Sequence, residues 1–211
     1  MKADAVIVGA GLAGCTAARL LAEKEKTVLV VERLRHIGGH CHDARNEAGI
    51  TVHTYGPHIL HTASKNVWDF VTRFSAFRPY QHRVLSYAEG RLYPFPLNID
   101  TVNQIFGTGL DIEEMDSFLK RQVELAEFTD PPENFRDAVV SQAGERLYEL
   151  FFKNYTRKQW EREPEDLSPE LAKRVPLRCS RDDRYFSDQY QGIPLRGYTK
   201  LAEQLLDHSG I

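Results

Sequence analysis

The chain has 211 residues, of which 42% are hydrophobic and 27% charged, as in an ordinary soluble globular protein of one or two domains. Its 27 basic and 30 acidic side chains leave a formal charge of −3, which provides no basic field for nucleic acid or anionic lipid. No apolar run approaches the roughly 18–20 residues that cross a bilayer, and the N-terminus lacks the layout of a signal peptide. The three cysteines, Cys15, Cys41 and Cys179, argue against a disulfide scaffold and favour a reducing cytoplasm.

The N-terminal segment predicts a βαβ unit, in which a helix joins two parallel strands. Residues 5–8 and 27–31 are short, continuous apolar runs, which are typical of strands buried on both faces of a sheet. Residues 12–25 between them are rich in helix-forming Ala, Leu, Glu and Lys, so we expect a helix there.

Three glycines, Gly9, Gly11 and Gly14, lie between the first strand and this helix in the spacing GxGxxG. In dinucleotide-binding folds they provide a tight turn, close approach of the backbone to a pyrophosphate, and close packing of helix on strand. Glu32, 18 positions after Gly14, is placed to accept hydrogen bonds from an adenosine ribose. A second glycine turn at residues 38–39 stands where an NAD dehydrogenase would continue with a third βα unit, so the sequence favours FAD over NAD.

Six of the eight histidines lie between residues 36 and 61. One interpretation is a metal site, although the spacings do not form HExxH and no cysteine pair accompanies them. A second is a set of scattered surface and strand-end histidines. A third is that one or two of them face a bound flavin, and Tyr55-Gly56-Pro57-His58 is the best candidate because Gly and Pro shape a backbone that approaches a ring closely.

The rest of the chain predicts a mixture of helices and antiparallel strands. We expect an amphipathic helix over 67–74, followed by a β-hairpin over 80–97 with its turn at 89–90. The region over 100–165 should be almost wholly helical, with breaks at 107–109, 131–132 and 144. A loop over 166–176, a strand over 184–190 that turns at Gly192, and an amphipathic helix over 199–208 should follow.

Aromatic residues recur in the stretch from Phe151 to Trp160. On an α-helix Phe151, Tyr155 and Thr156 share a face, with Trp160 one turn beyond. Core packing is the usual explanation of such aromatics. The alternative is a stacking platform for a base, and the arginines that follow would then serve its phosphates. These arginines, interleaved with Tyr185 and Tyr190, are Arg174, Arg178, Arg181 and Arg184. No Ser-His-Asp order, P-loop or paired carboxylate indicates a hydrolase or a kinase.

Taken together, these motifs resemble the bacterial UDP-galactopyranose mutases along nearly the whole chain. The resemblance runs through VIVGAGLAGCTAARLL, VLVVERLRHIGGH, VHTYGPHILHT, RLYPFPLNIDT, YTRKQW and RVPLRCSRDDRYFSDQYQGIPLRGYTKL. It implies an α/β fold: an FAD-binding Rossmann-like domain with an inserted helical subdomain and an antiparallel sheet. It also implies interconversion of UDP-galactopyranose and UDP-galactofuranose, a precursor of cell-wall polysaccharide. N5 of the reduced flavin would act as the nucleophile on the anomeric carbon of the sugar.

The resemblance carries over residue by residue. It implies a pyrophosphate loop at Gly9, Gly11, Ala13 and Gly14, an adenosine site at Glu32 and Arg33, and flavin contacts at Gly39, His40, His58 and Ile59. It implies substrate contacts at His82, Phe151, Tyr155, Thr156, Trp160, Arg178 and Tyr185. His58 would lie nearest the reactive ring edge through its backbone, and Arg178 would close over the diphosphate on a mobile loop. Two residues depart from the pattern: His40 replaces Asn and Leu60 replaces Phe.

The resemblance also implies an organisation in segments. These are an FAD-binding segment over 1–79, a hairpin of the substrate sheet over 80–99, a helical subdomain over 100–165, a mobile loop and strand over 166–195, and a helix returning to the FAD domain over 196–211. Mutases of the family are longer and form homodimers, so we expect these residues to be the N-terminal half to two-thirds of the usual chain. The alternatives are a truncated, inactive fragment and another FAD enzyme of the amine-oxidase-like fold.

Overall fold

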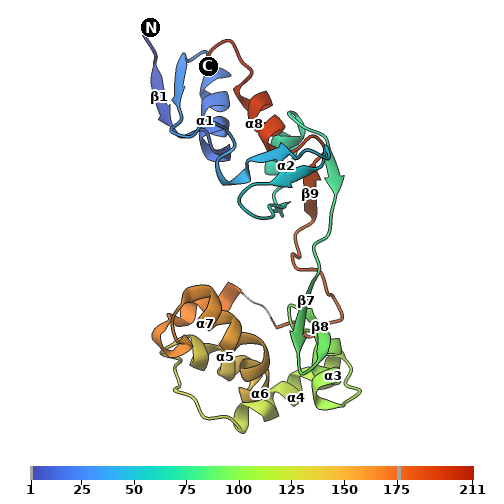
Figure 1. Cartoon of the computed structure of the whole chain (residues 1–211). Coiled ribbons are helices and arrows are strands. Elements are labelled where there is room, and N and C mark those ends of the chain that lie inside the picture. Colours follow the sequence, from blue (N-terminus) through green and yellow to red (C-terminus); the bar gives the residue numbers. More distant parts are fainter. Residues whose placement is uncertain (1, 175–176) are drawn as a thin grey trace. The chain divides into compact units, whose positions relative to one another are not determined.

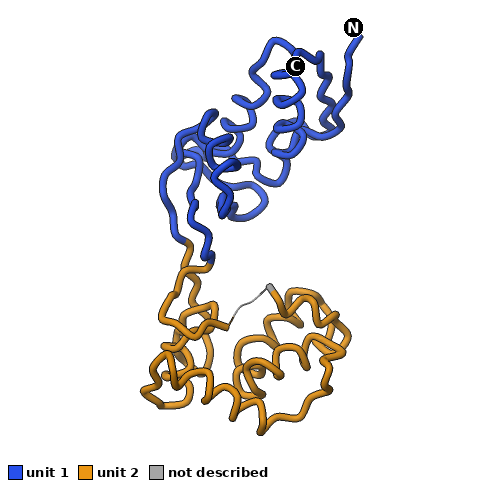
Figure 2. The backbone as a smooth tube through the Cα atoms, turned by 180° about the vertical axis from the view of Figure 1, so that it is seen from behind, with its two compact units in different colours: residues 1–81, 186–211 blue, residues 82–185 orange. Residues whose placement is uncertain are grey.

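The computed structural model describes residues 2–174 and 177–211, which form two compact units. Unit 1 takes the chain up to Gln81 and again from Phe186 onward, and unit 2 is the stretch between them (Figure 2). Unit 2 is therefore an insertion in the chain of unit 1. Each unit has an apolar core of its own.

Unit 1 begins with the predicted βαβ unit. Strand β1 (Ala5–Val8) pairs in parallel with β2 (Val28–Val31), and α1 (Leu12–Ala22) connects them (Figure 1). Helix α1 ends three residues before the predicted end, because Glu25 adopts a left-handed conformation with φ 58°. Helix α8 (Tyr198–Leu206) packs beside α1 and supplies much of this core.

The prediction that these two strands are buried on both faces is wrong. One face of the pair carries Val6 and Val8 from β1, which are 60% and 87% exposed, beside Leu29 and Val31 from β2. The alternating burial arises because α1 packs against the other face, and no described element covers this one. The two strands have the apolar composition of an interior parallel sheet. In the described part of the chain, however, only one of their two faces is covered.

The remaining elements of unit 1 are small antiparallel sheets, one short helical turn and one helix. They are the 3₁₀ turn η1 (Gly39–Cys41), the paired strands β3 (Asp43–Arg45) and β4 (Thr51–His53), helix α2 (Lys65–Thr72), and the three-stranded sheet in which β9 (Tyr190–Pro194) lies between β5 (Leu60–Thr62) and β6 (Phe77–Pro79).

The predicted strand over 184–190 with a turn at Gly192 is wrong, because the strand starts at Tyr190 and Gly192 lies inside it. A Cβ on Gly192 would lie 2.9 Å from the carbonyl oxygen of Arg78. The glycine therefore allows β6 to approach β9 closely and does not end the strand.

Unit 2 begins with the predicted hairpin, formed by β7 (Val84–Ala88) and β8 (Arg91–Phe95). Positive φ angles at Glu89 and Gly90 make its two-residue turn. The helical part follows as α3 (Ile99–Phe106), α4 (Ile112–Glu124), α5 (Phe135–Ala143), α6 (Glu145–Leu147), the π-helix η2 (Tyr148–Lys153) and α7 (Asn154–Trp160).

The predicted breaks in this helical region are confirmed. Gly107 ends α3 in the left-handed conformation, and Gly144 separates α5 from α6 with φ 78°. Residues 131–132 lie between α4 and α5. Helix α3 and the π-helix η2 contact the hairpin, and α4 and α5 extend the same core, in which Leu97, Met115 and Tyr148 are fully buried.

The loop predicted over 166–176 is instead largely 3₁₀ helix. The two short helices are η3 (Pro164–Asp166) and η4 (Pro169–Arg174), and residues 175 and 176 lie outside the described residues. A proline starts each helix, where its fixed φ is favourable and its missing N–H costs no hydrogen bond. Leu167 and Ala172 then become part of the core of unit 2.

The two ends of unit 2 meet. The backbone N–H of Tyr185 donates to the carbonyl of His82 at 2.7 Å, and Arg83 and Arg184 form a β-bridge beside them. The predicted class, a Rossmann-like βαβ domain with an inserted helical subdomain and antiparallel strands, is confirmed. In the described residues, no helix is both long and apolar enough to span a bilayer.

Candidate functional site

The glycine-rich loop of unit 1 forms a cradle, which we define as Gly9, Gly11, Gly14 and the turn at residues 38–39. Gly9 has φ 101°, a conformation that glycine adopts without strain. Gly11 caps α1 without any side-chain hydrogen bond, and the first turn of α1 carries no acidic residue. The open N–H groups and the positive end of the helix dipole therefore favour an anion at this position.

The backbone contacts of the cradle leave no room for side chains. A Cβ on Gly14 would lie 1.9 Å from the carbonyl oxygen of Gly9, so α1 can approach β1 only through glycine. A Cβ on Gly39 would lie 3.0 Å from the Cα of Gly11, and the N–H of Gly38 donates to Ala10 at 2.8 Å. The two glycine turns are in direct contact, and this geometry fits the pyrophosphate of a dinucleotide.

Glu32 directly follows β2, and its side chain lies beside the first glycine turn of the cradle. One of its carboxylate oxygens accepts the N–H of Ala10 at 2.6 Å and the other accepts that of Leu34 at 2.8 Å. These two hydrogen bonds, first that of Leu34, hold the pKa of Glu32 below its usual range. The ionised carboxylate keeps lone pairs that a ribose hydroxyl could use. Arg33, beside it, and Ala13, on α1, are exposed.

The other predicted cofactor residues also lie on unit 1. His40 is exposed on η1, and its ring centroid lies 5.6 Å from that of Tyr55. His58 and Ile59 are half-buried ahead of β5. The N–H of His58, which we expect to approach the flavin, donates to Nδ1 of His53 at 3.0 Å in this structure.

The histidine-rich stretch forms ring contacts. His36 stacks on His42 with ring centroids 3.9 Å apart, and His61 stacks on Phe186 at 3.7 Å. Among the described residues, no group of three or more His, Cys, Asp or Glu side chains is arranged to hold a metal ion.

All seven predicted substrate residues lie on unit 2, but they have different surroundings. Phe151 and Thr156 are buried, and the ring of Phe151 contacts Tyr93 edge-on at 5.6 Å. Tyr155 and Trp160 are 60% and 44% exposed.

The expectation that Phe151 and Tyr155 share a face is wrong. The π-helix η2 covers Phe151 and bonds each residue to the fifth one along. Thr156, five positions after Phe151, is buried with it, whereas Tyr155, four positions after Phe151, is exposed. Within the stretch from Phe151 to Trp160, the exposed aromatic side chains are those of Tyr155 and Trp160.

Arg178 is enclosed by its own segment of chain. Its guanidinium donates to the carbonyls of Asp182 at 3.3 Å, Tyr185 at 3.1 Å, and Arg184. Its backbone N–H donates to Leu97 at 2.9 Å. In this conformation Arg178 holds the turn over 178–185 together, and its predicted role at a diphosphate stays a prediction.

His82 and Tyr185 lie together at the ends of unit 2, with ring centroids 5.6 Å apart. Beside them Arg184 donates two hydrogen bonds to the carboxylate of Asp182, at 2.9 and 2.8 Å. This pairing lowers the pKa of Asp182 to about 2. His82, Arg178 and Tyr185 are thus brought together by the structure. The side chain of Arg174 lies outside the described part of the chain.

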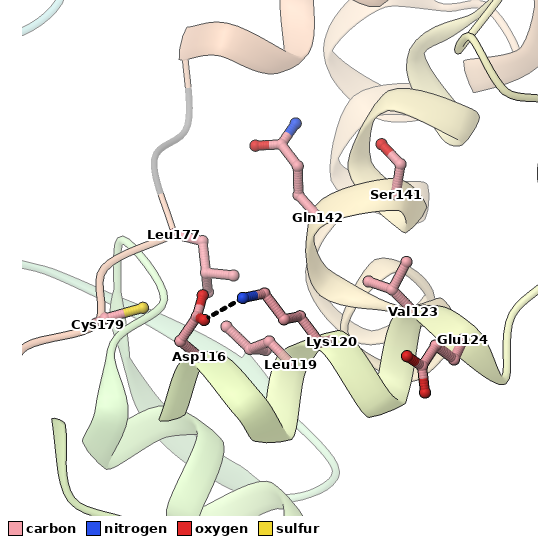
Figure 3. Close-up of a pocket in the computed structure, with 9 residues that line it drawn as sticks. All are labelled: Asp116, Leu119, Lys120, Val123, Glu124, Ser141, Gln142, Leu177 and Cys179. Atoms are coloured by element: carbon pink, nitrogen blue, oxygen red, sulfur yellow. Dashed lines mark ion pairs between the residues drawn. The ribbon is translucent and has the colours of Figure 1, made fainter. Parts of the chain in front are cut away.

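A pocket of about 460 Å³ opens between α4, α5 and residues 177–179 (Figure 3). The ion pair between Asp116 and Lys120 lies on its α4 side, and Ser141 and Gln142 come from α5. None of the seven predicted substrate residues lines it. The pocket is therefore separate from the site that the sequence predicts.

Asp43 is a structurally important residue that the sequence reasoning missed. Its buried carboxylate accepts the N–H groups of Tyr198 at 2.6 Å and Thr199 at 3.0 Å, and so caps α8. A Cβ on Gly197 would lie 2.6 Å from this carboxylate, which explains the glycine before the helix. In the sequence, this glycine is the only local sign of an unusual start to α8, since the capping residue Asp43 lies far away in the chain.

Comparison with known proteins adds the following. A sequence profile described as UDP-galactopyranose mutase matches residues 150–211, and one described as an NAD(P)-binding Rossmann-like domain matches residues 7–74. Over 207 residues the chain is 41% identical to a dTDP-fucopyranose mutase of Escherichia coli and 38% identical to a probable UDP-galactopyranose mutase of Klebsiella pneumoniae. Both alignments cover 98% of this chain but 54% and 53% of the relatives, so the chain spans about half the length of the curated relatives it matches.

A solved structure of reduced UDP-galactopyranose mutase has the same fold. It matches with a TM-score of 0.74 and 22% identity, covering 97% of this chain and 46% of that one. The agreement extends over both units, each of which corresponds to part of a larger protein in that structure.

Proposed function

We propose that the chain belongs to the UDP-galactopyranose mutase family and provides the dinucleotide-binding and nucleotide-recognising parts of a flavin-dependent sugar-nucleotide mutase. The reaction would interconvert the pyranose and furanose forms of UDP-galactose. The observation that carries the proposal is the glycine cradle, where two glycine turns and an uncapped helix N-terminus leave a site shaped for a pyrophosphate.

We propose FAD as the dinucleotide. The pyrophosphate would be held by Gly9, Gly11, Ala13 and Gly14, the adenosine by Glu32 and Arg33, and the flavin by Gly39, His40, His58 and Ile59. Support comes from the absence of side-chain atoms at the cradle and from the ionised state of Glu32. When bound and reduced, the flavin would supply the nucleophile for the anomeric carbon of the sugar.

We propose that unit 2 recognises the nucleotide half of the substrate. Tyr155 and Trp160 present exposed aromatic faces for a base, and Phe151 and Thr156 support them from the core. His82, Arg178 and Tyr185 would receive the diphosphate and the sugar. For Arg178 this requires its guanidinium to leave the carbonyls that it now contacts.

A second substrate is favoured by one specific observation. The relative with 41% identity is named a dTDP-fucopyranose mutase, against 38% for the probable UDP-galactopyranose mutase. UDP-galactose and dTDP-fucose differ at the base, at the 2′ position of the pentose and at C6 of the hexose. Assays should therefore compare UDP-galactose with dTDP-fucose. An amine-oxidase-like activity would instead consume oxygen with amines and ignore both nucleotides.

The setting of the protein is also a proposal. We place it in the cytoplasm, with support from three cysteines that form no disulfide among the described residues. The family resemblance suggests a homodimer with no nucleic-acid or membrane partner. Analytical ultracentrifugation of the whole protein would measure the oligomeric state.

The cofactor is tested with two matched glycine variants. We expect the purified chain to bind FAD and Gly39→Ala to lose it, because a Cβ there enters the cradle 3.0 Å from Gly11. Gly49→Ala is the control, since Gly49 also has a positive φ, of 77°, but no heavy atom within 4 Å of an added Cβ. Both variants strain a backbone with positive φ, but only Gly39→Ala places a methyl group inside the cradle. A chain that stays colourless with added FAD would contradict the proposal.

The substrate is tested by binding and by turnover. Titration of UDP and dTDP into a Trp68→Phe background follows the fluorescence of Trp160, and Tyr155→Ala should weaken binding. Tyr87→Ala is the control, because Tyr87 is equally aromatic, 75% exposed, and placed on the hairpin. Turnover of UDP-galactofuranose or dTDP-fucofuranose after dithionite reduction then separates a mutase from an inactive, nucleotide-binding fragment.

A further inference from the structure

Two of the histidines in the sequence 36–42 enclose the second glycine turn. The rings of His36 and His42 stack at 3.9 Å with an angle of 24° between their planes, and residues 38–39 lie between them in the chain. Both rings bond the same carbonyl, that of Ile37, through Nδ1 at 3.3 and 3.1 Å. We call this pair the histidine clamp.

The hydrogen bonds define which ring nitrogens carry protons. A carbonyl oxygen only accepts, so Nδ1 of each ring must carry its proton to bond Ile37. Nε2 of His36 forms a second hydrogen bond, with the hydroxyl of Tyr55 at 2.8 Å. Both ring nitrogens of His36 and Nδ1 of His42 are therefore hydrogen-bonded.

The clamp is also attached to the start of α8. The hydroxyl of Thr199 donates to the carbonyl of Asp43 at 2.7 Å, and its oxygen accepts the N–H of Asp43 at 2.9 Å. The same oxygen lies 3.0 Å from Nδ1 of His42 and shares its proton with the carbonyl of Ile37. The chain of contacts runs from α8 through His42 and His36 to Tyr55. It fixes both ends of a turn whose middle has φ 89° and 56°.

We propose that His36 and His42 are positioning residues for the cofactor cradle. The clamp holds the 38–39 turn in the left-handed conformation in which Gly38 bonds Ala10 and Gly39 contacts Gly11. This inference rests on the proposed function, because it assigns the clamp to the binding of a dinucleotide. Neither ring needs to touch the cofactor, since the effect passes through the backbone of the turn.

Variants at His42 separate the contribution of the stacked ring to FAD binding from that of the hydrogen bond. His42→Asn keeps a donor close to the position of Nδ1 and loses the ring, His42→Phe keeps the ring and loses the donor, and His42→Ala loses both. If His42→Ala leaves the competent turn populated in one molecule of ten, the apparent Kd for FAD rises about tenfold. We expect the Asn and Phe variants to recover part of that loss, and Tyr55→Phe to have a smaller effect.

His61→Ala is the matched control. His61 also stacks on a ring, that of Phe186, and bonds a partner, Asp188, within unit 1. It should lower the melting temperature like a clamp variant but leave the affinity for FAD within about twofold. An equal loss of affinity in His61→Ala would mean that FAD binding follows general stability, which would overturn the proposal.

Hydrogen exchange on the ligand-free chain provides a readout that is independent of the cofactor. The N–H of Gly38 donates to the carbonyl of Ala10, and the N–H of Cys41 donates to that of Gly38. Both amides should exchange faster in His42→Ala, and their exchange rates should not change in His61→Ala. If this acceleration is seen but the wild-type chain binds no FAD, the clamp holds the turn, and its assignment to a dinucleotide fails together with the proposed function. If the wild type binds FAD and His42→Ala binds it equally well, the clamp is wrong and the proposed function stands.

Discussion

Gly14 is the residue at which the packing of unit 1 excludes a side chain most strongly. An added Cβ would lie 1.9 Å from the carbonyl oxygen of Gly9, and both atoms belong to backbone that cannot move without separating α1 from β1. The third glycine of the fingerprint is thus required by the fold itself, before any ligand binds. This agrees with its expected role in helix–strand packing.

Gly14→Ala should therefore destabilise unit 1 by at least about 2–3 kcal/mol, as overpacking of a rigid site does. Gly109→Ala is the control, because no heavy atom lies within 4 Å of an added Cβ and its φ lies outside the left-handed region. There the loss of unfolded-state freedom should give a neutral effect or a gain of up to about 1 kcal/mol. Urea titration of both variants measures the difference, and similar midpoints would contradict the structure.

Asp182 makes the stability of unit 2 depend on pH at the acid end. The paired guanidinium of Arg184 lowers the folded-state pKa from its usual 3.8 to about 2. A carboxyl group with a depressed pKa stabilises the fold above the unfolded value and loses this contribution as the pH falls through the folded value. The loss should therefore occur between about pH 4 and pH 2.

Asp182→Asn should lower stability at pH 7 by less than about 1 kcal/mol, because solvent reaches about a third of each side chain of the pair and screens it. At pH 2 much of the difference from wild type should disappear. Asp116→Asn, which removes an even more exposed pair with Lys120, should change little at either pH. Thermal melts at the two pH values test this, and a constant difference across them would exclude the pair as its cause.

At the scale of elements, the start of α8 depends on a residue from β3. Asp43 accepts two backbone N–H groups of the helix from a buried position, while the caps of α3 and α4 come from residues next to their own helices. Cap residues satisfy N–H groups that the helix itself leaves unpaired. In α8 this cap also joins β3 of unit 1 to its last helix.

Asp43→Ala should cost about 2–3 kcal/mol, because it leaves buried N–H groups without partners. Asp43→Asn retains a single acceptor oxygen and should lose less. Asp111→Ala removes the exposed capping box of α4 and should cost about 1 kcal/mol. In chemical denaturation we expect the largest loss of stability for Asp43→Ala, a smaller one for Asp43→Asn and the smallest for Asp111→Ala. An Asp43→Ala variant that loses no more stability than Asp111→Ala would refute the assigned cap.

The elements that the sequence predicts well are those whose signals are local. The hairpin follows from alternating strands around Glu89 and Gly90, and the helix breaks follow from Gly107 and Gly144. The βαβ unit follows from two apolar runs and the glycines between them. In each case neighbouring residues determine the backbone, so the pattern and the structure agree.

The features that the sequence does not predict depend on distant partners or on unusual helical winding. Asp43 and Tyr198 are 155 positions apart, and nothing near Asp43 indicates that it caps a helix. The i, i+4 spacing of Phe151 and Tyr155 assumes an α-helix and a shared face, but the structure has a π-helix at Phe151 and buries Phe151 alone of the two. The stacking of His36 on His42 needs the turn between them to be known first.

At the scale of the whole molecule, the predicted site residues divide between the two units. The ten predicted cofactor residues belong to unit 1 and the seven predicted substrate residues to unit 2. Each unit also has its own core, so each set of residues is positioned by packing within one unit. This division predicts that ligands act on the units separately.

Unit 2 should fold when it is excised as residues 82–185. Its ends already meet through the hydrogen bond from Tyr185 to His82, and its core of hairpin and helices is complete within that range. We expect a cooperative thermal transition by circular dichroism, with a midpoint that rises with added UDP and not with FAD. The complementary chain, in which a short linker joins Gln81 to Phe186, should respond to FAD and not to UDP.

A shorter fragment, residues 82–163, is the control for this experiment. It lacks η3 and η4, and with them Leu167 and Ala172, which are buried against the helices of unit 2. Because burying an aliphatic side chain contributes about 1.5–3 kcal/mol, the shorter fragment should lose its cooperative transition or melt well below the longer one. Non-cooperative melting of 82–185 itself would mean that the core of unit 2 depends on the rest of the chain, and the division of function between two self-contained units would then be wrong.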